Sequence, residues 1–206
     1  MPSSRKQEIS DETRRRLIDA GFELAAEGGS AAMSIQAVAD RSQISRGSVA
    51  WHFGSKDGLV IAVVQEAFSW GIEFIRERLA QSKEARIEIL VEANFDLMAQ
   101  PKARIFHTIL LEALSRESPV REAYAEHYVK LRAVYARYLA PLASDAGAAD
   151  ALAVALLGGT LGINIQHRLD PDTVDRRSAV DALEAVYARA LGSAWRTSKQ
   201  GSRKGT

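Results

Sequence analysis

The chain has 206 residues, of which 47% are apolar and 26% are charged, and its formal net charge is +1 at pH 7. This composition is ordinary for a soluble globular protein, and the balanced charge argues against sequence-independent coating of nucleic acid. Cysteine is absent, which excludes disulfides, zinc fingers and thiol catalysis. No phosphate-binding, nucleophile-elbow or zinc-protease motif occurs, and the four histidines are scattered. We therefore expect neither an enzyme nor a metal or cofactor site.

The ends of the chain and its longest uncharged run indicate the localisation of the protein. No apolar segment suited to a secretory signal follows Met1, so the sequence predicts a cytoplasmic protein. The longest uncharged run, residues 151–166, is shorter than the roughly 20 residues of a membrane span, so we expect a buried helix and no membrane partner. Residues 1–9 and 196–206 are expected to be flexible tails. As an alternative, Arg5 and Lys6 could reach into a DNA minor groove.

The first helix is expected to begin at Ser10, which suits an N-cap because two carboxylates follow it. Apolar residues recur on one face as far as Gly28-Gly29, where the helix should end. A short second helix is predicted from the N-cap Ser34 to a turn at Ser42-Gln43. These two helices precede the segment that carries the candidate DNA contacts.

Ser45 is a further N-cap candidate, and it begins a third short helix. Val49 and Phe53 recur four residues apart, so their face should pack inward while the other side chains face outward. The outward residue types suit phosphates and base edges, because arginine offers a donor fork and glycine permits close backbone approach. Two short helices joined by a tight turn are typical of a helix-turn-helix motif. The candidate DNA contacts are Ser34, Ser45, Arg46, Gly47, Ser48, Trp51, His52 and Lys56.

Lys56 is included for an electrostatic reason. Ser55 is a third N-cap candidate, and Lys56 falls in the first turn of the helix it begins. The helix dipole disfavours a cation there by roughly 0.3–1 kcal/mol. A DNA phosphate at this terminus would use both the free backbone donors and the lysine charge. The alternative is a solvated surface lysine.

Helical periodicity continues through the rest of the chain, and no strand pattern appears. Further helices are expected at about 55–79, 85–100, 103–116, 120–140, 146–169 and 174–195. The fold class is therefore predicted as all-α, with about nine helices. We expect a three-helix DNA-binding domain at residues 10–56 and a helical effector-binding and dimerisation domain at residues 57–195.

Small residues near the C-terminus suggest a homodimer. Gly158 and Gly162 lie four residues apart within an apolar run, which allows close helix approach. A two-fold interface with a second copy would bury this run, and such a dimer reads DNA half-sites roughly 34–36 Å apart. Burial within a single chain is the alternative. The candidate interface residues are Leu156, Gly158, Gly159, Gly162, Leu183, Val186, Tyr187 and Ala190.

Polar and aromatic residues on the apolar middle helices indicate a cavity for a small molecule. A mostly apolar ligand with one or two polar handles would match such a lining. Each of these residues could instead be satisfied within the core. The candidate effector contacts are Asn94, Phe95, Met98, His107, Tyr124, His127, Tyr128 and Asn164.

The segment SIQAVADRSQISRGSVAWHFGSKDGL, from Ser34 to Leu59, resembles the DNA-binding domain of the TetR family of bacterial transcriptional regulators. The resemblance is strong over residues 10–60, and the later helices agree in number and character. It implies a ligand-responsive repressor of double-stranded operator DNA; a DNA-binding dimer without an effector is the alternative. Two positions depart from the family pattern. Ala50 stands where a tyrosine is usual, and Gln43 stands at a turn position where glycine adopts a left-handed conformation freely.

Overall fold

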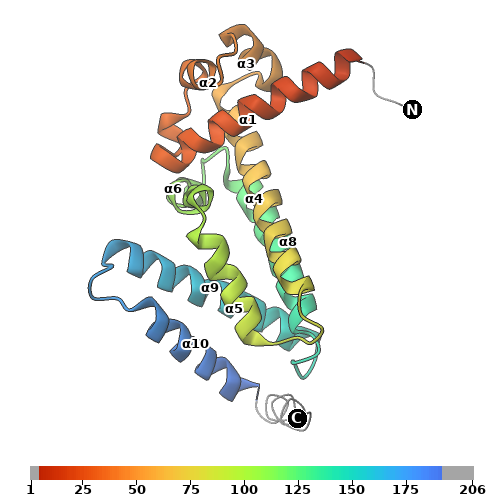
Figure 1. Cartoon of the computed structure of the whole chain (residues 1–206), viewed down its shortest axis with the longest axis vertical. Coiled ribbons are helices and arrows are strands. Elements are labelled where there is room, and N and C mark those ends of the chain that lie inside the picture. The colour runs from red at the N-terminus through yellow and green to blue at the C-terminus, as the bar shows by residue number, and fades with distance from the viewer. Residues whose placement is uncertain (1–4, 192–206) are drawn as a thin grey trace. The chain divides into compact units, whose positions relative to one another are not determined.

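The computed structural model describes residues 5–191, apart from the side chain of Ala190, and these residues form helices and connecting turns without a strand. The all-α prediction is confirmed. Figure 1 follows the helices in chain order. They are α1 (Arg5–Ala32), α2 (Ile35–Ser42), α3 (Arg46–Phe53), α4 (Lys56–Ala80), α5 (Ile87–Ala99), the 3₁₀ helix η1 (Pro101–Arg104), α6 (Ile105–Thr108), α7 (Leu110–Leu114), α8 (Arg121–Leu139), α9 (Ala146–Leu169) and α10 (Arg176–Ala190).

The chain forms two compact units. The first unit combines the chain up to Gly71 with the segment Gln100–His127. The second unit combines Ile72–Ala99 with the chain from Tyr128 onward. Helices α4 and α8 each contribute residues to both units.

The start of α1 differs from the prediction. Ser10 lies inside the helix, which begins at Arg5, so residues 5–9 are helical rather than part of a flexible tail. Arginine, lysine, glutamine and glutamate are good helix formers, which explains why the helix extends past the serine. Residues 1–4 and 196–206 lie outside the described residues. The predicted end at the glycines is confirmed by non-helical backbone, with φ −145° at Gly28 and +65° at Gly29.

The segment 103–116 is not the single helix that its periodicity predicted. It is divided into η1, α6 and α7, and the backbone at Ile109 departs from the helix with φ −104° and ψ −13°. The Thr108 hydroxyl donates a hydrogen bond of 2.7 Å to the Ala25 carbonyl of α1. A Cβ on Gly29 would lie 2.9 Å from the Thr108 carbonyl oxygen, so only glycine permits this close approach. Contacts with α1 thus override the local helical pattern.

The predicted buried helix at residues 151–166 is wrong for a single chain. Helix α9 buries one face, including Ala153 and Leu156, but Val154 is 55% exposed and Gly158 is exposed too. By length and composition, α4 and α9 could each cross a membrane, with mean hydropathy of 1.5 and 1.6 over their most apolar windows. The core helices of soluble proteins pass the same criteria, so these two helices are weak evidence for membrane insertion.

A candidate DNA-binding surface and the family of the chain

Three serine N-caps position the helices of the motif. The Ser34 hydroxyl oxygen accepts a hydrogen bond of 3.0 Å from the Ala37 amide. Ser45 accepts one of 3.2 Å from Ser48, and Ser55 accepts one of 3.0 Å from Gly58. Each bond engages an amide in the first turn of its helix, and the Ser48 amide also donates to the Ser45 carbonyl at 3.0 Å, so all three predicted caps are confirmed. The hydroxyl protons of Ser34 and Ser45 remain available as donors.

The turn between α2 and α3 depends on a strained residue. Gln43 has φ 58° and ψ 36°, the left-handed conformation that its position predicted. This conformation costs a residue other than glycine roughly 1–2 kcal/mol. The Arg16 guanidinium of α1 donates a hydrogen bond of 2.9 Å to the Ser42 carbonyl, and the Ile44 amide donates one of 3.1 Å to Ala39. These bonds hold the turn at the angle that presents α3.

Arg41 joins α2 to α1. Its guanidinium forms ion pairs of 3.2 Å with Glu23 and 3.1 Å with Glu27. The hydrogen bond from Arg41 lowers the pKa of Glu27, and the same bond raises the pKa of Arg41. These ion pairs were not predicted from the sequence. The spacing of the two glutamates, four residues apart on one helix face, was the available signal.

Helix α3 has a buried side and an exposed side, as its pattern predicted. Val49 is fully buried, whereas Trp51 is 74% exposed and Arg46 is also exposed. Phe53 differs from the prediction because it is only half-buried, with the Arg14 guanidinium carbon 5.5 Å from its ring centre. Figure 1 places α2 and α3 beside one another, next to α1.

Gly47 lies on the exposed side of α3 and is not required by packing within the chain. A Cβ built there would meet no atom closer than the Ser45 hydroxyl oxygen, at 4.0 Å. Glycine in a helix costs about 0.5–1 kcal/mol relative to alanine. The structure therefore leaves space beside the backbone at this position, where a DNA strand could approach.

His52 is suited to hydrogen bonding as a neutral ring. It is half-buried, and its ring lies edge-on to Trp51 with centroids 4.6 Å apart. Burial lowers the pKa of His52, the positive charge of Arg14 lowers it further, and Asp11 opposes the shift. The lowered pKa favours the neutral ring, which offers one donor and one acceptor.

Lys56 is the first residue of α4, and it is exposed. The link from α3 to α4 is tight at Gly58, where an added Cβ would lie 2.2 Å from the Phe53 carbonyl oxygen. Asp57 supplies the acidic charge that the first turn favours, next to the lysine. All eight predicted DNA-contact residues are therefore exposed or half-exposed in the segment from Ser34 to Lys56.

The predicted effector residues are divided between the two units. His107, Tyr124 and His127 belong to the first unit. The His127 ring stacks on Phe68 at 5.2 Å, and the Tyr124 ring meets the same phenyl edge-on at 4.9 Å. The Tyr124 hydroxyl donates to the Ile105 carbonyl at 3.4 Å. These aromatic rings form part of the core of the first unit.

The other five effector candidates, Asn94, Phe95, Met98, Tyr128 and Asn164, belong to the second unit. The buried Asn94 amide donates a hydrogen bond of 2.8 Å to the Tyr135 hydroxyl. The buried Asn164 amide donates one of 2.9 Å to the Thr160 carbonyl in its own helix. Phe95 is buried and Met98 is half-buried, and burial raises the pKa of the half-buried Tyr128. Both amides are thus engaged within the chain.

The predicted dimer residues fall into two groups. Leu156 and Tyr187 are buried within the chain, and a Cβ on Gly159 would lie 2.7 Å from a methyl carbon of Leu183 in α10. A Cβ on Gly158 or Gly162 would meet no atom within 4 Å, and Val186 is 61% exposed. The first group packs α9 against α10, while the second group remains open. The side chain of Ala190 lies outside the described residues.

Comparison with known proteins places this arrangement in a family. The family described as bacterial regulatory proteins, tetR family, matches residues 17–63, which hold the helix-turn-helix. The HTH-type transcriptional regulator BetI of Burkholderia cenocepacia (strain HI2424) is 30% identical over 201 residues, spanning 88% of this chain and all of BetI. The chain belongs to the TetR family. It is a TetR-family helix-turn-helix transcriptional regulator.

Solved structures of similar fold extend the comparison to the whole chain. A transcriptional regulator from Pseudomonas aeruginosa PAO1 has a TM-score of 0.73 and 21% identity, covering 91% of this chain and 94% of that chain. The multidrug binding protein EbrR, complexed with proflavin, has a TM-score of 0.60 and 25% identity, covering 83% of this chain and 97% of that chain. The TetR-family fold therefore includes the helices beyond the DNA-binding motif.

Proposed function

We propose that this regulator is a repressor that binds a two-fold operator as a homodimer and leaves it when a small molecule binds. The exposed side of α3 carries this proposal, because Arg46 and Trp51 face solvent beside a glycine that packing within the chain does not require. Residues 10–56 are assigned to DNA binding, and residues 57–195 to effector binding and dimerisation. We assign it no catalytic role, and its place of action is the cytoplasm.

The side chains of the surface have separate roles in this proposal. Arg46 offers two parallel donors to guanine or a phosphate, and the neutral His52 and the Ser48 hydroxyl offer hydrogen bonds to base edges. The amide groups at the start of α4, together with Lys56, bind a phosphate. Ser34 and Ser45 cap their helices and donate their remaining protons to the DNA backbone.

The homodimer rests on the open side of α9. Gly158, Gly162 and Val186 leave a surface of small and apolar groups beside the packed contact of α9 with α10. A second copy related by two-fold symmetry would cover the same patch on both chains. Such a dimer presents two copies of α3 to successive major grooves. A Gly162→Leu variant should become monomeric in sedimentation while its helical circular dichroism stays unchanged.

Release by an effector requires a ligand that prefers the conformation unable to bind DNA. The candidate contacts are the eight residues named from the sequence, of which three belong to the first unit and five to the second; His107 comes first in the first unit and Tyr128 in the second. The likeness to EbrR, a multidrug binding protein solved with proflavin, supports an apolar ligand with polar handles. A DNA-binding dimer without an effector is the second candidate function, favoured by the hydrogen bonds that already engage Asn94 and Asn164.

The first experiment is a footprint of the purified protein on the DNA flanking its own gene, with competitor DNA present. A protected two-fold site supports the proposal. If no site is protected there, the same assay on genomic fragments follows, and the absence of specific protection on every fragment contradicts the proposal. Trp51→Ala should then weaken binding to this site at least tenfold, or about 1.4 kcal/mol, without lowering Tm. The matched control is Leu111→Ala, which removes another side chain that is 78% exposed. Equal operator affinity of the two variants would show that Trp51 is not part of the DNA-binding surface.

A thermal-shift screen separates the two candidate functions. A true effector stabilises the folded protein by mass action, so that Tm rises with its concentration. The panel should include proflavin, which is a planar aromatic diamine, together with planar apolar compounds that carry one polar group. A hit that also lowers operator affinity supports the repressor, whereas hits without any change in operator affinity favour the DNA-binding dimer.

A further inference from the structure

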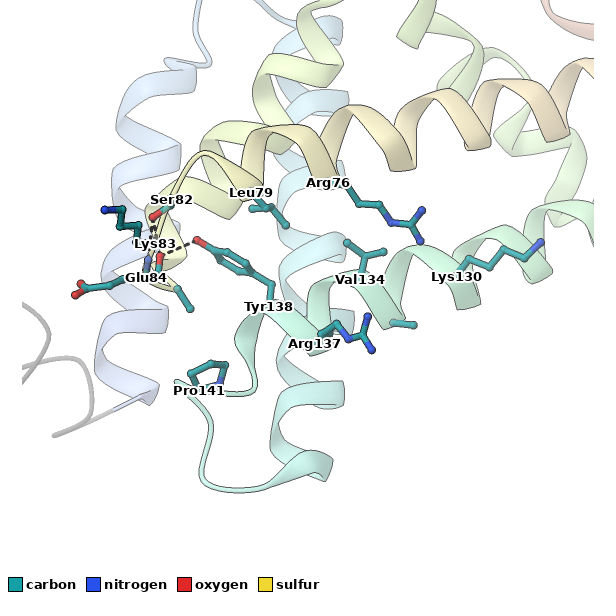
Figure 2. A pocket seen from close by; sticks show the side chains of 12 residues that line it. Arg76, Leu79, Ser82, Lys83, Glu84, Lys130, Val134, Arg137, Tyr138 and Pro141 are labelled. Atoms are coloured by element: carbon teal, nitrogen blue, oxygen red, sulfur yellow. Dashed lines mark hydrogen bonds between the residues drawn. The ribbon is translucent and has the colours of Figure 1, made fainter.

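The second unit contains a groove of about 780 Å³ that the predicted functions do not use. It is lined by the C-terminal end of α4, the loop that follows it, and the later turns of α8. Figure 2 shows Arg76 extending from α4 toward α8, the helix that carries Lys130 and Arg137. None of the predicted DNA, effector or dimer residues lines this groove.

Positive charge is concentrated in this groove. Its ionisable lining consists of four cations, Arg76, Lys83, Lys130 and Arg137, and a single carboxylate from Glu84, apart from the phenol of Tyr138. The whole chain, in contrast, has a formal net charge of only +1. Such a cluster within a concave surface raises the local concentration of anions.

The ion pair that Arg76 forms is weak. Arg76 meets Glu73 of its own helix at 3.5 Å, and both side chains are more than half exposed. Exposed pairs of this kind contribute about 0–1 kcal/mol. A ligand anion could therefore replace Glu73 as the partner of Arg76 at little cost.

Tyr138 gives the groove a fixed wall. Its hydroxyl accepts a hydrogen bond of 3.0 Å from the Arg86 amide and approaches the Arg86 carbonyl at 3.3 Å. The Ser82 hydroxyl donates a bond of 2.7 Å to the Glu84 carbonyl within the same loop. These bonds fasten the loop that carries Lys83 to α8, so the cations are presented from a preformed surface.

The floor between the charges is apolar. Leu79 lines the groove but is itself buried, whereas Val134 is half-buried and Pro141, beyond the end of α8, is exposed. An inorganic anion would leave Val134 and Pro141 exposed to water. A ligand with an apolar body and one acidic head would cover them while its head meets the cations.

We propose that this groove binds a small amphiphilic anion, with an acidic head between Arg76 and Arg137 and an apolar body along Leu79 and Val134. This proposal does not depend on the release of the operator. Ligand binding to the groove is measured directly, and the groove residues are separate from those assigned to DNA binding. The same lining disfavours an amphiphilic cation, since Arg76, Lys130 and Arg137 would repel a positive head group.

The test is isothermal titration of the full-length protein with decanoate, below its micelle concentration, compared with decylammonium. Wild type should bind decanoate saturably and decylammonium at least tenfold more weakly. The Arg76→Gln/Arg137→Gln double variant should lose up to about twenty-fivefold in decanoate affinity, because each exposed ion pair of up to about 1 kcal/mol corresponds to roughly fivefold. Arg104→Gln, which removes an exposed arginine of the first unit, is the matched control and should bind as wild type.

Several outcomes would contradict the proposed ligand site. They are no measurable heat with decanoate, equal affinity for the two detergents, and equal affinity in the double variant and the control. Circular dichroism and Tm should be recorded for each protein. If the double variant does not fold, Arg137→Gln alone decides, with an expected loss of about fivefold, because this exposed side chain lies outside the core.

Discussion

Replacement of Gly47 by alanine should raise the stability of the protein and lower its affinity for DNA. In the free protein the new methyl group would meet nothing closer than the Ser45 hydroxyl oxygen at 4.0 Å, so no neighbour has to move. Alanine is favoured over glycine in a helix by about 0.5–1 kcal/mol. For a chain of this length, that gain corresponds to a rise in Tm of roughly 1–4 °C.

The loss of DNA affinity comes from the same methyl group. Gly47 is exposed between Ser45 and Trp51 on the side of α3 assigned to the operator. A methyl group added to a close-packed contact typically costs about 1–3 kcal/mol, so operator affinity should fall at least about fivefold. Fluorescence anisotropy with labelled operator measures the affinity, and thermal denaturation followed by circular dichroism measures the stability.

Gly147→Ala provides the control, since Gly147 is an exposed glycine in the first turn of α9 and is not among the predicted DNA contacts. It makes the same chemical change and should leave operator affinity unaltered. Unchanged affinity in Gly47→Ala, together with higher stability, would refute the close approach of DNA to this residue. A fall in Tm would instead refute the open space inferred beside it.

Three further predictions concern Lys56, Gln43 and His52. Lys56→Ala should weaken binding to all DNA sequences alike and reduce the slope of log K against log salt by about 0.9; a changed base preference would contradict a phosphate contact. Gln43→Gly should raise the free energy of unfolding in urea by about 0.5–1 kcal/mol. The variant relieves the left-handed strain at φ 58°, but glycine also raises the conformational entropy of the unfolded chain, which offsets part of the gain. A loss of stability would show that the glutamine side chain compensates for the strain. His52 has a lowered pKa, so the unfolded chain binds more protons just below the ordinary value of 6.5, and this residue should reduce stability as the pH falls through that window. Arg14→Gln should raise the pKa of His52 in an NMR titration. An unchanged titration curve would show that Arg14 does not lower the pKa of His52.

The parts of the motif that depend on neighbouring residues were predictable from the sequence. The caps at Ser34, Ser45 and Ser55 and the left-handed turn at Gln43 each depend on a few adjacent residues, and all four are present. The fully buried Val49 likewise follows from helical spacing. Local chemistry therefore predicts the local geometry of the DNA-binding surface.

Features that depend on contacts distant in sequence were not predictable in the same way. Arg41 pairs with glutamates 14 and 18 residues earlier in the chain, and Thr108 bonds to a carbonyl 83 residues earlier. The Thr108 contact lies within the helix expected at 103–116, which the structure divides. Contacts between residues distant in sequence leave no periodic signal in the sequence. The cationic groove brings together residues from α4, the following loop and α8, so their shared location becomes evident only in three dimensions.

The contact of Gly29 with Thr108 has a consequence for the engineering of hybrid regulators. Residues 100–127 belong to the same compact unit as the helix-turn-helix, although they are separated from it by the whole of α5. A hybrid that exchanges only residues 1–56 would retain Thr108 but could replace Gly29, and any side chain at position 29 would bring its Cβ within 2.9 Å of the Thr108 carbonyl oxygen. The transferable module is discontinuous. Exchange of DNA specificity between relatives should therefore carry both segments, residues 1–71 and 100–127, as one piece.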